Sequence, residues 1–290
     1  MDTIGISTST QFCAVIGNPI GHSLSPAIHN AAFAAAGLDF VYLAFRIEDV
    51  AGVFAGMRAI PSFRGMSITI PHKVAAIQYV DEVEGIDRKI GSINTVIREG
   101  ERLVGFGTDG PGALKALRDA GVEPEGKRVL LLGSGGAARA ISFSLAFSAR
   151  PAELALLDIQ EAMLGQLAAD LREGTGAHIT AAPLTEETLA KAMSTADIII
   201  HCTPVGMHPK VDASLISADL FRPGQVVFDI VYTPLQTKLL ADARARGLTT
   251  ISGVEMFVNQ AALQFERFAG VDAPVAVMRK VVLDALTKKT

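Results

Sequence analysis

The sequence has no tryptophan and only two cysteines among its 290 residues. So few cysteines exclude a disulfide framework, and we expect a reducing compartment, the cytoplasm. No run of about 18 apolar residues lacks a charge, so we expect no membrane-spanning helix. The first ten residues contain no lysine or arginine and no apolar core, so we expect a loose tail and no signal peptide. The net charge of -4 gives no reason to expect a nucleic acid partner.

Apolar residues are abundant, at 49% of the chain, and charged residues make up only 19%. This composition excludes a disordered chain. The excess of alanine, valine, isoleucine and leucine is typical of a buried parallel sheet covered by helices. At about 150 residues per domain, the length predicts two domains or one large α/β unit.

Short apolar runs alternate with helical patterns along the chain, which is typical of an α/β fold. We expect strands at 12–17, 41–45, 65–70, 93–98, 129–132, 154–157, 196–202 and 226–230. We expect helices at 26–36, 48–57, 73–79, 111–120, 160–171, 235–246, 255–268 and 274–287. This order predicts a first domain over 1–110, a nucleotide-binding domain over 111–250, and C-terminal helices over 251–290 that return to the first domain.

A glycine-rich turn follows the apolar run at 129–132. Gly133-Ser134-Gly135-Gly136-Ala137-Ala138 fits G-x-G-x-x-G/A, with alanine at the third position. The first glycine permits a tight turn, and the second lets the backbone approach a pyrophosphate at the helix N-terminus. The alternative is an ordinary strand-to-helix turn that happens to be rich in glycine. The flanking strand and helix patterns favour a Rossmann-type dinucleotide site.

Asp158 ends the next predicted strand, 25 residues after Gly133. A carboxylate at about this spacing accepts hydrogen bonds from the ribose hydroxyls of NAD and repels the 2′-phosphate of NADP. Neither Ile159 nor Gln160 supplies a positive charge. The sequence therefore favours NAD over NADP. The alternative role of Asp158 is to cap the helix that follows.

Four polar clusters stand at element ends in the first third of the chain. They are residues 17–26, 67–73, 91–95 and 105–110. Because the carboxyl ends of strands form the ligand crevice of an α/β sheet, these clusters indicate a small, polyhydroxylated substrate. Each serine, threonine or asparagine alone could instead serve a turn or a helix cap.

Lys73 and Asp109 supply one ammonium and one carboxylate to these clusters. We interpret them as an acid–base pair that exchanges a proton with a carbonyl oxygen as hydride is transferred. The alternative for Lys73 is a solvated lysine at a helix start, where the helix dipole disfavours a cation.

Eight ordered segments together resemble the shikimate dehydrogenase family over nearly the whole chain. They are residues 18–30, 68–73, 93–95, 108–110, 133–139, 203–207, 229–232 and 253–261. The resemblance implies two α/β domains, with C-terminal helices on the first. It also implies the reversible reduction of 3-dehydroshikimate to shikimate with NAD or NADP.

The family's site residues transfer to matching positions. Lys73 would exchange the proton, with Asp109 as its partner. The residues implied for the substrate carboxylate are Ser23 and Ser25, with Tyr232 nearby, and those for the ring hydroxyls are Thr69, Asn94, Asp109 and Gln260. The residues implied for the cofactor are Gly133, Ser134, Gly135, Gly136, Ala137, Asp158 and Thr203, with Ile230 and Gly253 near the nicotinamide.

The chain departs from the family pattern at three places. Gly107 and His201 stand where the family usually has asparagine. Residues 158–160 replace the Asn-Arg-Thr with which NADP-using members hold the 2′-phosphate. Asp158 resembles the NAD-using members, some of which also oxidise quinate.

Two other classes of function stay open at this point. One is a quinate/shikimate dehydrogenase that uses NAD. The other is a protein on the same fold that binds a metabolite without turning it over; retention of Lys73 and Asp109 argues against it. The histidines show no metal-ligand spacing with Cys13 or Cys202, so we expect no metal site. We expect a monomer or a homodimer.

Overall fold

The computed structural model describes residues 5–288, which divide into two compact units. One unit comprises the chain up to Thr108 together with Val258–Ala285, and the other comprises Asp109–Phe257 with the residues from Leu286 onward. The expected boundaries were 110 and 250; the first two breaks follow Thr108 and Phe257, and a third follows Ala285. Among the described residues, no helix is both long and apolar enough to cross a membrane.

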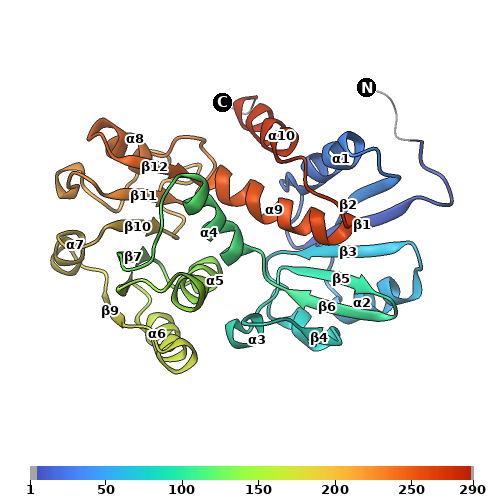
Figure 1. Cartoon of the computed structure of the whole chain (residues 1–290), viewed down its shortest axis with the longest axis horizontal. Coiled ribbons are helices and arrows are strands. Elements are labelled where there is room, and N and C mark those ends of the chain that lie inside the picture. The colour runs from blue at the N-terminus through green and yellow to red at the C-terminus, as the bar shows by residue number, and fades with distance from the viewer. Residues whose placement is uncertain (1–4, 289–290) are drawn as a thin grey trace. The chain divides into compact units, whose positions relative to one another are not determined.

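The first unit contains a mixed six-stranded sheet with the order β2-β1-β3-β5-β6-β4 (Figure 1). Strand β1 runs parallel to β2 and β3, and β4 runs parallel to β6, whereas β5 runs antiparallel to its neighbours β3 and β6. Its elements are β1 (Gln11–Gly17), α1 (Ser25–Ala35), β2 (Phe40–Arg46), α2 (Val50–Ala59), β3 (Phe63–Ile68), η1 (Ala75–Tyr79), β4 (Glu82–Val83), α3 (Asp87–Ile90), β5 (Thr95–Glu99) and β6 (Arg102–Phe106), followed after the second unit by most of α9 (Gly253–Ala269) and α10 (Val275–Thr287).

Helix α9 packs on the first sheet through aromatic side chains. Phe265 contacts Phe33 of α1 with 5.2 Å between ring centroids, and both are fully buried. The Phe268 ring lies over Gly65 of β3, where a side chain of any size would collide with it. This packing brings residues of the C-terminal segment beside strands that lie about 200 positions earlier in the sequence.

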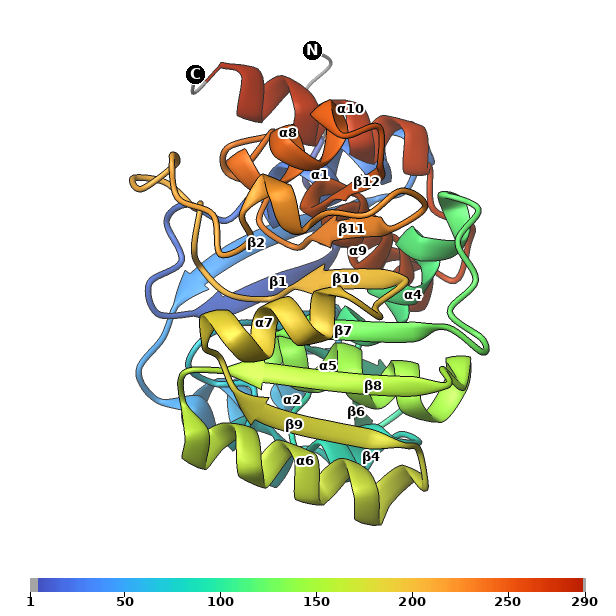
Figure 2. The same ribbon diagram turned by 90° about the vertical axis from the view of Figure 1, so that its left-hand side faces the viewer.

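The second unit contains a fully parallel sheet with the order β12-β11-β10-β7-β8-β9 (Figure 2). Its elements are α4 (Asp109–Asp119), β7 (Arg128–Leu132), α5 (Gly136–Ser144), η2 (Leu145–Ala149), β8 (Glu153–Asp158), α6 (Glu161–Thr175), β9 (Ile179–Pro183), α7 (Glu186–Met193), β10 (Ile198–His201), η3 (Ala218–Leu220), β11 (Val226–Asp229), α8 (Lys238–Ala245) and β12 (Thr249–Ser252). Figure 1 shows α7 and α8 on one face of this sheet and α5 on the other. This is the strand order of dinucleotide-binding folds. From β7 the sheet grows in one direction through β8 and β9 and in the opposite direction through β10, β11 and β12, so the order reverses between β7 and β10.

The structure confirms the α/β class, and it corrects two local expectations. The helix expected at 73–79 is a five-residue 3-10 helix, η1, preceded by a turn that holds Lys73. The expected loose tail lies partly outside the described residues, and its end is fixed: the Thr10 hydroxyl donates to Asp39 at 2.7 Å. The sequence analysis did not identify the short strands β4, β9 and β12 or the helices α3 and α7.

His29 of α1 is fully buried and stacks on Tyr42 with 4.3 Å between ring centroids. Neither of its ring nitrogens has a hydrogen-bond partner among the described residues. Burial lowers the pKa of His29 to about 3, which the Gln264 side chain opposes only in part. The folded state therefore holds His29 neutral.

We expect this histidine to weaken the fold in acid. The unfolded chain binds a proton at His29 below about pH 6.5, whereas the folded chain does not until about pH 3. Stability is therefore fully present above pH 6.5 and is lost as the pH falls, by about 2 kcal/mol between pH 7 and pH 5. Urea unfolding at pH 7 and pH 5 measures the free energy of unfolding of each protein. Between these pH values, that free energy should fall by about 2 kcal/mol more in the native protein than in His29→Phe. The exposed His178→Gln serves as the control, and an equal loss in His29→Phe and the native protein contradicts the prediction.

Candidate active site

The glycine turn joins β7 to α5 in the second unit. Gly133 has a φ of +110°, a conformation that favours glycine, and its Cα approaches the Cys202 carbonyl so closely that a Cβ would lie 2.9 Å from that oxygen. Its N–H donates to the Leu157 carbonyl at 2.8 Å. The first glycine of the motif is therefore required by the packing of three neighbouring strands.

Gly135 and Gly136 differ from Gly133, because a Cβ on either would meet no atom within 4 Å. Both are exposed, and Gly135 has an ordinary φ of -69° as the N-cap of α5, with no side chain capping the helix. Nothing inside the protein explains why these positions lack side chains. An open backbone cradle at the N-terminus of a nine-residue helix fits a pyrophosphate, whose charge the helix N–H groups and dipole favour. Ala137 lies half-buried in the same first turn.

Ser134 and Asp158 are joined at the carboxyl ends of β7 and β8. The Ser134 hydroxyl donates to one carboxylate oxygen at 2.6 Å, and the Gln160 N–H donates to the other at 2.9 Å. Burial alone would raise the pKa of Asp158, but these hydrogen bonds outweigh it, and the net pKa lies below the usual value. Asp158 is therefore a fixed negative charge beside the cradle at neutral pH.

Thr203, Ile230 and Gly253 follow the next strands of the same sheet. The N–H of Cys202 donates to the Leu132 carbonyl at 2.8 Å, which places Thr203 beside the glycine turn. Ile230 follows β11, and Gly253 begins α9 against the Ile230 backbone, where no side chain would fit. The second unit thus brings its predicted cofactor residues to one edge of the sheet.

A buried histidine–aspartate pair lies behind Thr203, and the sequence analysis did not identify it as a pair. His201 Nδ1 lies 2.9 Å from Asp229 Oδ1, and His201 Nε2 lies 2.5 Å from the Thr203 hydroxyl. The sequence did contain one signal for this pair: His201 stands at a position where the family usually has asparagine.

Tyr232 also belongs to the second unit and stacks on Phe257, with 5.0 Å between ring centroids. Burial raises the pKa of Tyr232, so its hydroxyl keeps its proton at neutral pH.

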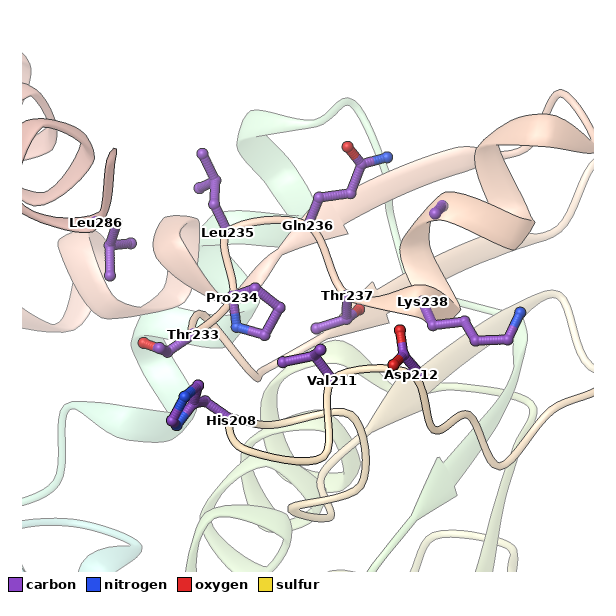
Figure 3. A pocket seen from close by; sticks show the side chains of 11 residues that line it. His208, Val211, Asp212, Thr233, Pro234, Leu235, Gln236, Thr237, Lys238 and Leu286 are labelled. Atoms are coloured by element: carbon purple, nitrogen blue, oxygen red, sulfur yellow. The ribbon is translucent and has the colours of Figure 1, made fainter. Parts of the chain in front are cut away.

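A pocket of about 530 Å³ opens between the loops that follow β10 and β11 (Figure 3). The residues His208, Pro234, Leu235, Thr237 and Lys238 contribute to its lining. None of the described residues that line it is a predicted site residue.

In the first unit, Asn94 and Gln260 meet through Thr108. The Asn94 amide donates to the Thr108 hydroxyl at 3.0 Å, and that hydroxyl lies 3.3 Å from Gln260 Oε1. All three side chains are buried. Two predicted substrate residues, 166 positions apart in the sequence, therefore form one polar cluster.

Four further side chains support this cluster; Ser67 and Thr95 lie in polar segments that the sequence analysis singled out, without a role of their own, and Tyr42 and Gln264 were not singled out. The Gln264 amide donates to the Thr95 hydroxyl at 2.9 Å, which donates to Asn94 Oδ1 at 2.8 Å. On its other side, Gln264 accepts from Ser67 at 2.8 Å, and Ser67 accepts from Tyr42 at 2.6 Å. This chain fixes which way the Asn94 amide faces. Only the packing of α9 on β3 and β5 creates it.

Ser23, Ser25 and Thr69 stand at other element ends of the first unit. Ser25 begins α1, and its N–H donates to the Ser23 hydroxyl at 3.2 Å. Thr69 directly follows β3, where its N–H donates to the Ile16 carbonyl at 3.0 Å. These positions fit the crevice at the strand ends, and the substrate contacts of these residues stay predictions.

Lys73 lies in the turn before η1, half-buried, and its carbonyl accepts from the Ile93 N–H at 3.0 Å. The backbone of Lys73 is thus fixed beside Asn94. The helix-dipole argument for Lys73 was wrong, because η1 begins only at Ala75 and has just five residues. Asp109 begins α4 and is assigned to the other unit, so its pairing with Lys73 stays a prediction.

The described part of the chain contains no group of three or more His, Cys, Asp or Glu side chains arranged to hold a metal ion. The first unit offers hydroxyls, amides and Lys73 for chemistry, and the second unit offers Asp109 and the cradle at Gly135 and Gly136.

Sequence profiles of known families match both ends of the chain. One described as "Shikimate dehydrogenase substrate binding domain" matches residues 15–96, and one described as "Shikimate 5'-dehydrogenase C-terminal domain" matches residues 253–283. A curated relative from Moorella thermoacetica, named shikimate dehydrogenase (NADP(+)), is 43% identical over 288 residues, which cover 98% of this chain and 96% of the relative.

Solved structures are similar over the same extent. Shikimate 5-dehydrogenase from Listeria monocytogenes, in complex with shikimate and NAD, has a TM-score of 0.91 and 33% identity, covering 96% of this chain and 98% of that one. Quinate dehydrogenase from Corynebacterium glutamicum, in complex with NAD, has a TM-score of 0.88 and 25% identity, covering 95% and 99%. The similarity includes both units, not the glycine turn alone.

Proposed function

Because the chain belongs to the shikimate dehydrogenase family, we propose that it catalyses the reversible, NAD(P)-dependent reduction of 3-dehydroshikimate to shikimate. Family membership confirms the resemblance seen in the sequence. The observation that carries the substrate assignment is the buried Asn94–Thr108–Gln260 cluster, in the unit that includes the substrate-binding profile.

In the proposed reaction, Lys73 exchanges the proton with the substrate oxygen. A bound nicotinamide supplies the hydride for reduction and accepts it for oxidation. As the carbonyl carbon gains hydride, the Lys73 ammonium gives a proton to the carbonyl oxygen; in the reverse direction the neutral amine removes the hydroxyl proton. Asp109 would stabilise the ammonium and bind a ring hydroxyl.

The remaining substrate contacts follow the chemistry of each side chain. Ser23 and Ser25 would donate to the substrate carboxylate, with Tyr232 nearby, because hydroxyls donate readily to anionic oxygens. Thr69, Asn94 and Gln260 would bind ring hydroxyls, which both donate and accept.

We further propose that NAD is preferred to NADP. Asp158 is held ionised by Ser134 and the Gln160 N–H, and the next side chain, Ile159, is exposed and apolar. Arg139 of α5, a cation in the same half of the unit, is engaged by Asp170 at 2.6 Å. The name of the Moorella relative specifies NADP, so this preference separates the chain from that relative.

The proposal includes the cytoplasm as its compartment and a monomer or homodimer as its assembly. Cys13 and Cys202 are both unpaired, and burial raises the pKa of each thiol, which keeps both protonated and unreactive.

The alternative substrate is quinate, which the similarity to the Corynebacterium enzyme favours. Quinate carries an extra hydroxyl on the carbon that bears the carboxylate, where Ser23 and Ser25 are proposed to bind. We expect this hydroxyl to be accommodated less well than the planar carbon of shikimate.

Initial rates of oxidation of shikimate and quinate, each with NAD⁺ and NADP⁺, test these proposals together. We expect the highest kcat/KM for shikimate with NAD⁺, at least tenfold above the value with NADP⁺. If neither acid is oxidised with either cofactor, the result contradicts the proposed function. Equal rates with the two cofactors contradict only the role of Asp158.

A further inference from the structure

A continuous hydrogen-bonded chain runs beneath the sheet edge from α8 to the loop after β10. It consists of Thr237, Asp229, His201 and Thr203, and the first three are at most 1% exposed. The Thr237 hydroxyl lies 2.6 Å from Asp229 Oδ2, His201 Nδ1 lies 2.9 Å from Asp229 Oδ1, and His201 Nε2 lies 2.5 Å from the Thr203 hydroxyl. The acid–base step proposed above does not use this chain.

The hydrogen positions in this chain follow from its donors and acceptors. The Thr237 oxygen accepts the Leu240 N–H at 3.3 Å as the cap of α8, so its own hydrogen is directed to Asp229. Asp229 Oδ1 also accepts the Val231 N–H at 3.1 Å. Because a carboxylate only accepts, the His201 nitrogen that faces it carries a hydrogen.

The other nitrogen of a neutral imidazole is then an acceptor. With a neutral His201, the Thr203 hydroxyl directs its hydrogen to His201 Nε2, and its oxygen accepts the Val205 N–H at 3.3 Å. The remaining lone pair of Thr203 can only accept. The chain thus converts a hydroxyl, which can donate or accept, into an oriented acceptor.

Thr203 stands on the nicotinamide side of the predicted dinucleotide site. Its methyl group would lie 3.2 Å from a Cβ at Gly133, so it flanks the glycine turn. Asp158, at the end of β8, marks the adenosine side, and β10 lies on the other side of β7. In this strand order the two halves of a dinucleotide lie on opposite sides of the turn.

We propose that His201 and Asp229 are positioning residues that orient the Thr203 hydroxyl to accept a hydrogen bond from the nicotinamide carboxamide NH₂. The inference rests on the proposed function, because it requires that the chain bind a nicotinamide cofactor. It assigns a purpose to the histidine that replaces the family's usual asparagine. A carboxamide offers the donor that this acceptor needs, and an acetyl group in its place does not.

Calorimetric binding of NADH tests the inference without turnover, with ADP-ribose as a ligand that lacks the nicotinamide. We expect Thr203→Val to weaken NADH binding about tenfold, the effect of one lost hydrogen bond, and to leave ADP-ribose binding unchanged. The reduced 3-acetylpyridine analogue should bind the native protein and Thr203→Val equally. Thr250→Val, a half-buried threonine that bonds Arg244, is the matched control and should bind NADH as the native protein does.

The role of His201 is tested by His201→Asn, whose shorter side chain can still reach Asp229 but not Thr203. It should weaken NADH binding several-fold in the native background and have no further effect in Thr203→Val. Additive losses, or a loss of ADP-ribose binding, indicate a merely structural role and overturn the inference.

The tautomer provides a test that requires no variant. ¹⁵N NMR of the histidine-labelled protein should show His201 with a hydrogen on Nδ1 and none on Nε2 at neutral pH. A hydrogen on Nε2 overturns the inference. If the native protein binds neither NADH, NADPH nor ADP-ribose, the proposed function itself fails. Normal NADH binding that is insensitive to Thr203→Val defeats only this inference.

Discussion

Lys73→Ala is expected to lower kcat for shikimate oxidation by about a thousandfold and to change KM by only a few-fold. General acid–base catalysis by one positioned side chain contributes about 10²- to 10⁴-fold. Ser23, Ser25, Asn94 and Gln260 would still bind the substrate, so the loss should fall on the chemical step. Steady-state rates with saturating cofactor measure it.

Lys73→Arg separates proton transfer from charge. Arginine keeps the positive charge but does not release its proton at neutral pH, so this variant should be as slow as Lys73→Ala. Lys280→Ala, on α10, removes a lysine whose side chain is 74% exposed, and it should leave the rates unchanged. A kcat close to that of the native protein in Lys73→Ala means that another group transfers the proton.

The second large effect is expected at the ribose end of the cofactor site. Asp158→Asn combined with Ile159→Arg should shift the ratio of kcat/KM for NADP⁺ over NAD⁺ upward by about a hundredfold. The change removes a buried negative charge that repels the 2′-phosphate and adds a cation that attracts it. At about 4 Å in a partly screened site, one such charge interaction amounts to a few kcal/mol, and 1.4 kcal/mol is tenfold.

The asparagine retains an oxygen for the Ser134 hydroxyl, so the turn should keep its shape. Asp284→Asn on α10 removes an exposed carboxylate of the same type and should leave the cofactor ratio unchanged. If the double variant keeps the native ratio, Asp158 does not select the cofactor, and its bond to Ser134 is structural.

Patterns local in sequence carried the prediction of the fold. The alternation of buried strands and helices depends on neighbours a few residues apart, so the α/β class could be predicted. The glycine turn could be predicted for the same reason, because a strand, a tight turn and a helix start lie within about ten residues. The short edge strands β4, β9 and β12 were missed because two to five residues carry too little periodicity.

In the candidate site, too, features that are local in sequence could be predicted, and contacts between distant residues could not. Gly133, Gly135 and Asp158 could be proposed as cofactor residues because their spacing along the chain reflects one strand–turn–helix–strand unit. Gln264 was not identified: alone in the sequence, a glutamine four residues after Gln260 reads as an ordinary helix residue. Its importance arises from Ser67 and Thr95, almost 200 and 170 positions away, which only the packing of α9 on the first sheet brings within hydrogen-bond distance.

By itself the sequence determined the α/β class, the family, the glycine turn and the types of side chain available for chemistry. The tertiary structure decided how those side chains face: which way the Asn94 amide points, why Asp158 stays ionised, and that His201 lies between Asp229 and Thr203. The reason is physical. A residue's type fixes what it can donate or accept, but its orientation and charge depend on buried partners that the fold brings together from distant positions.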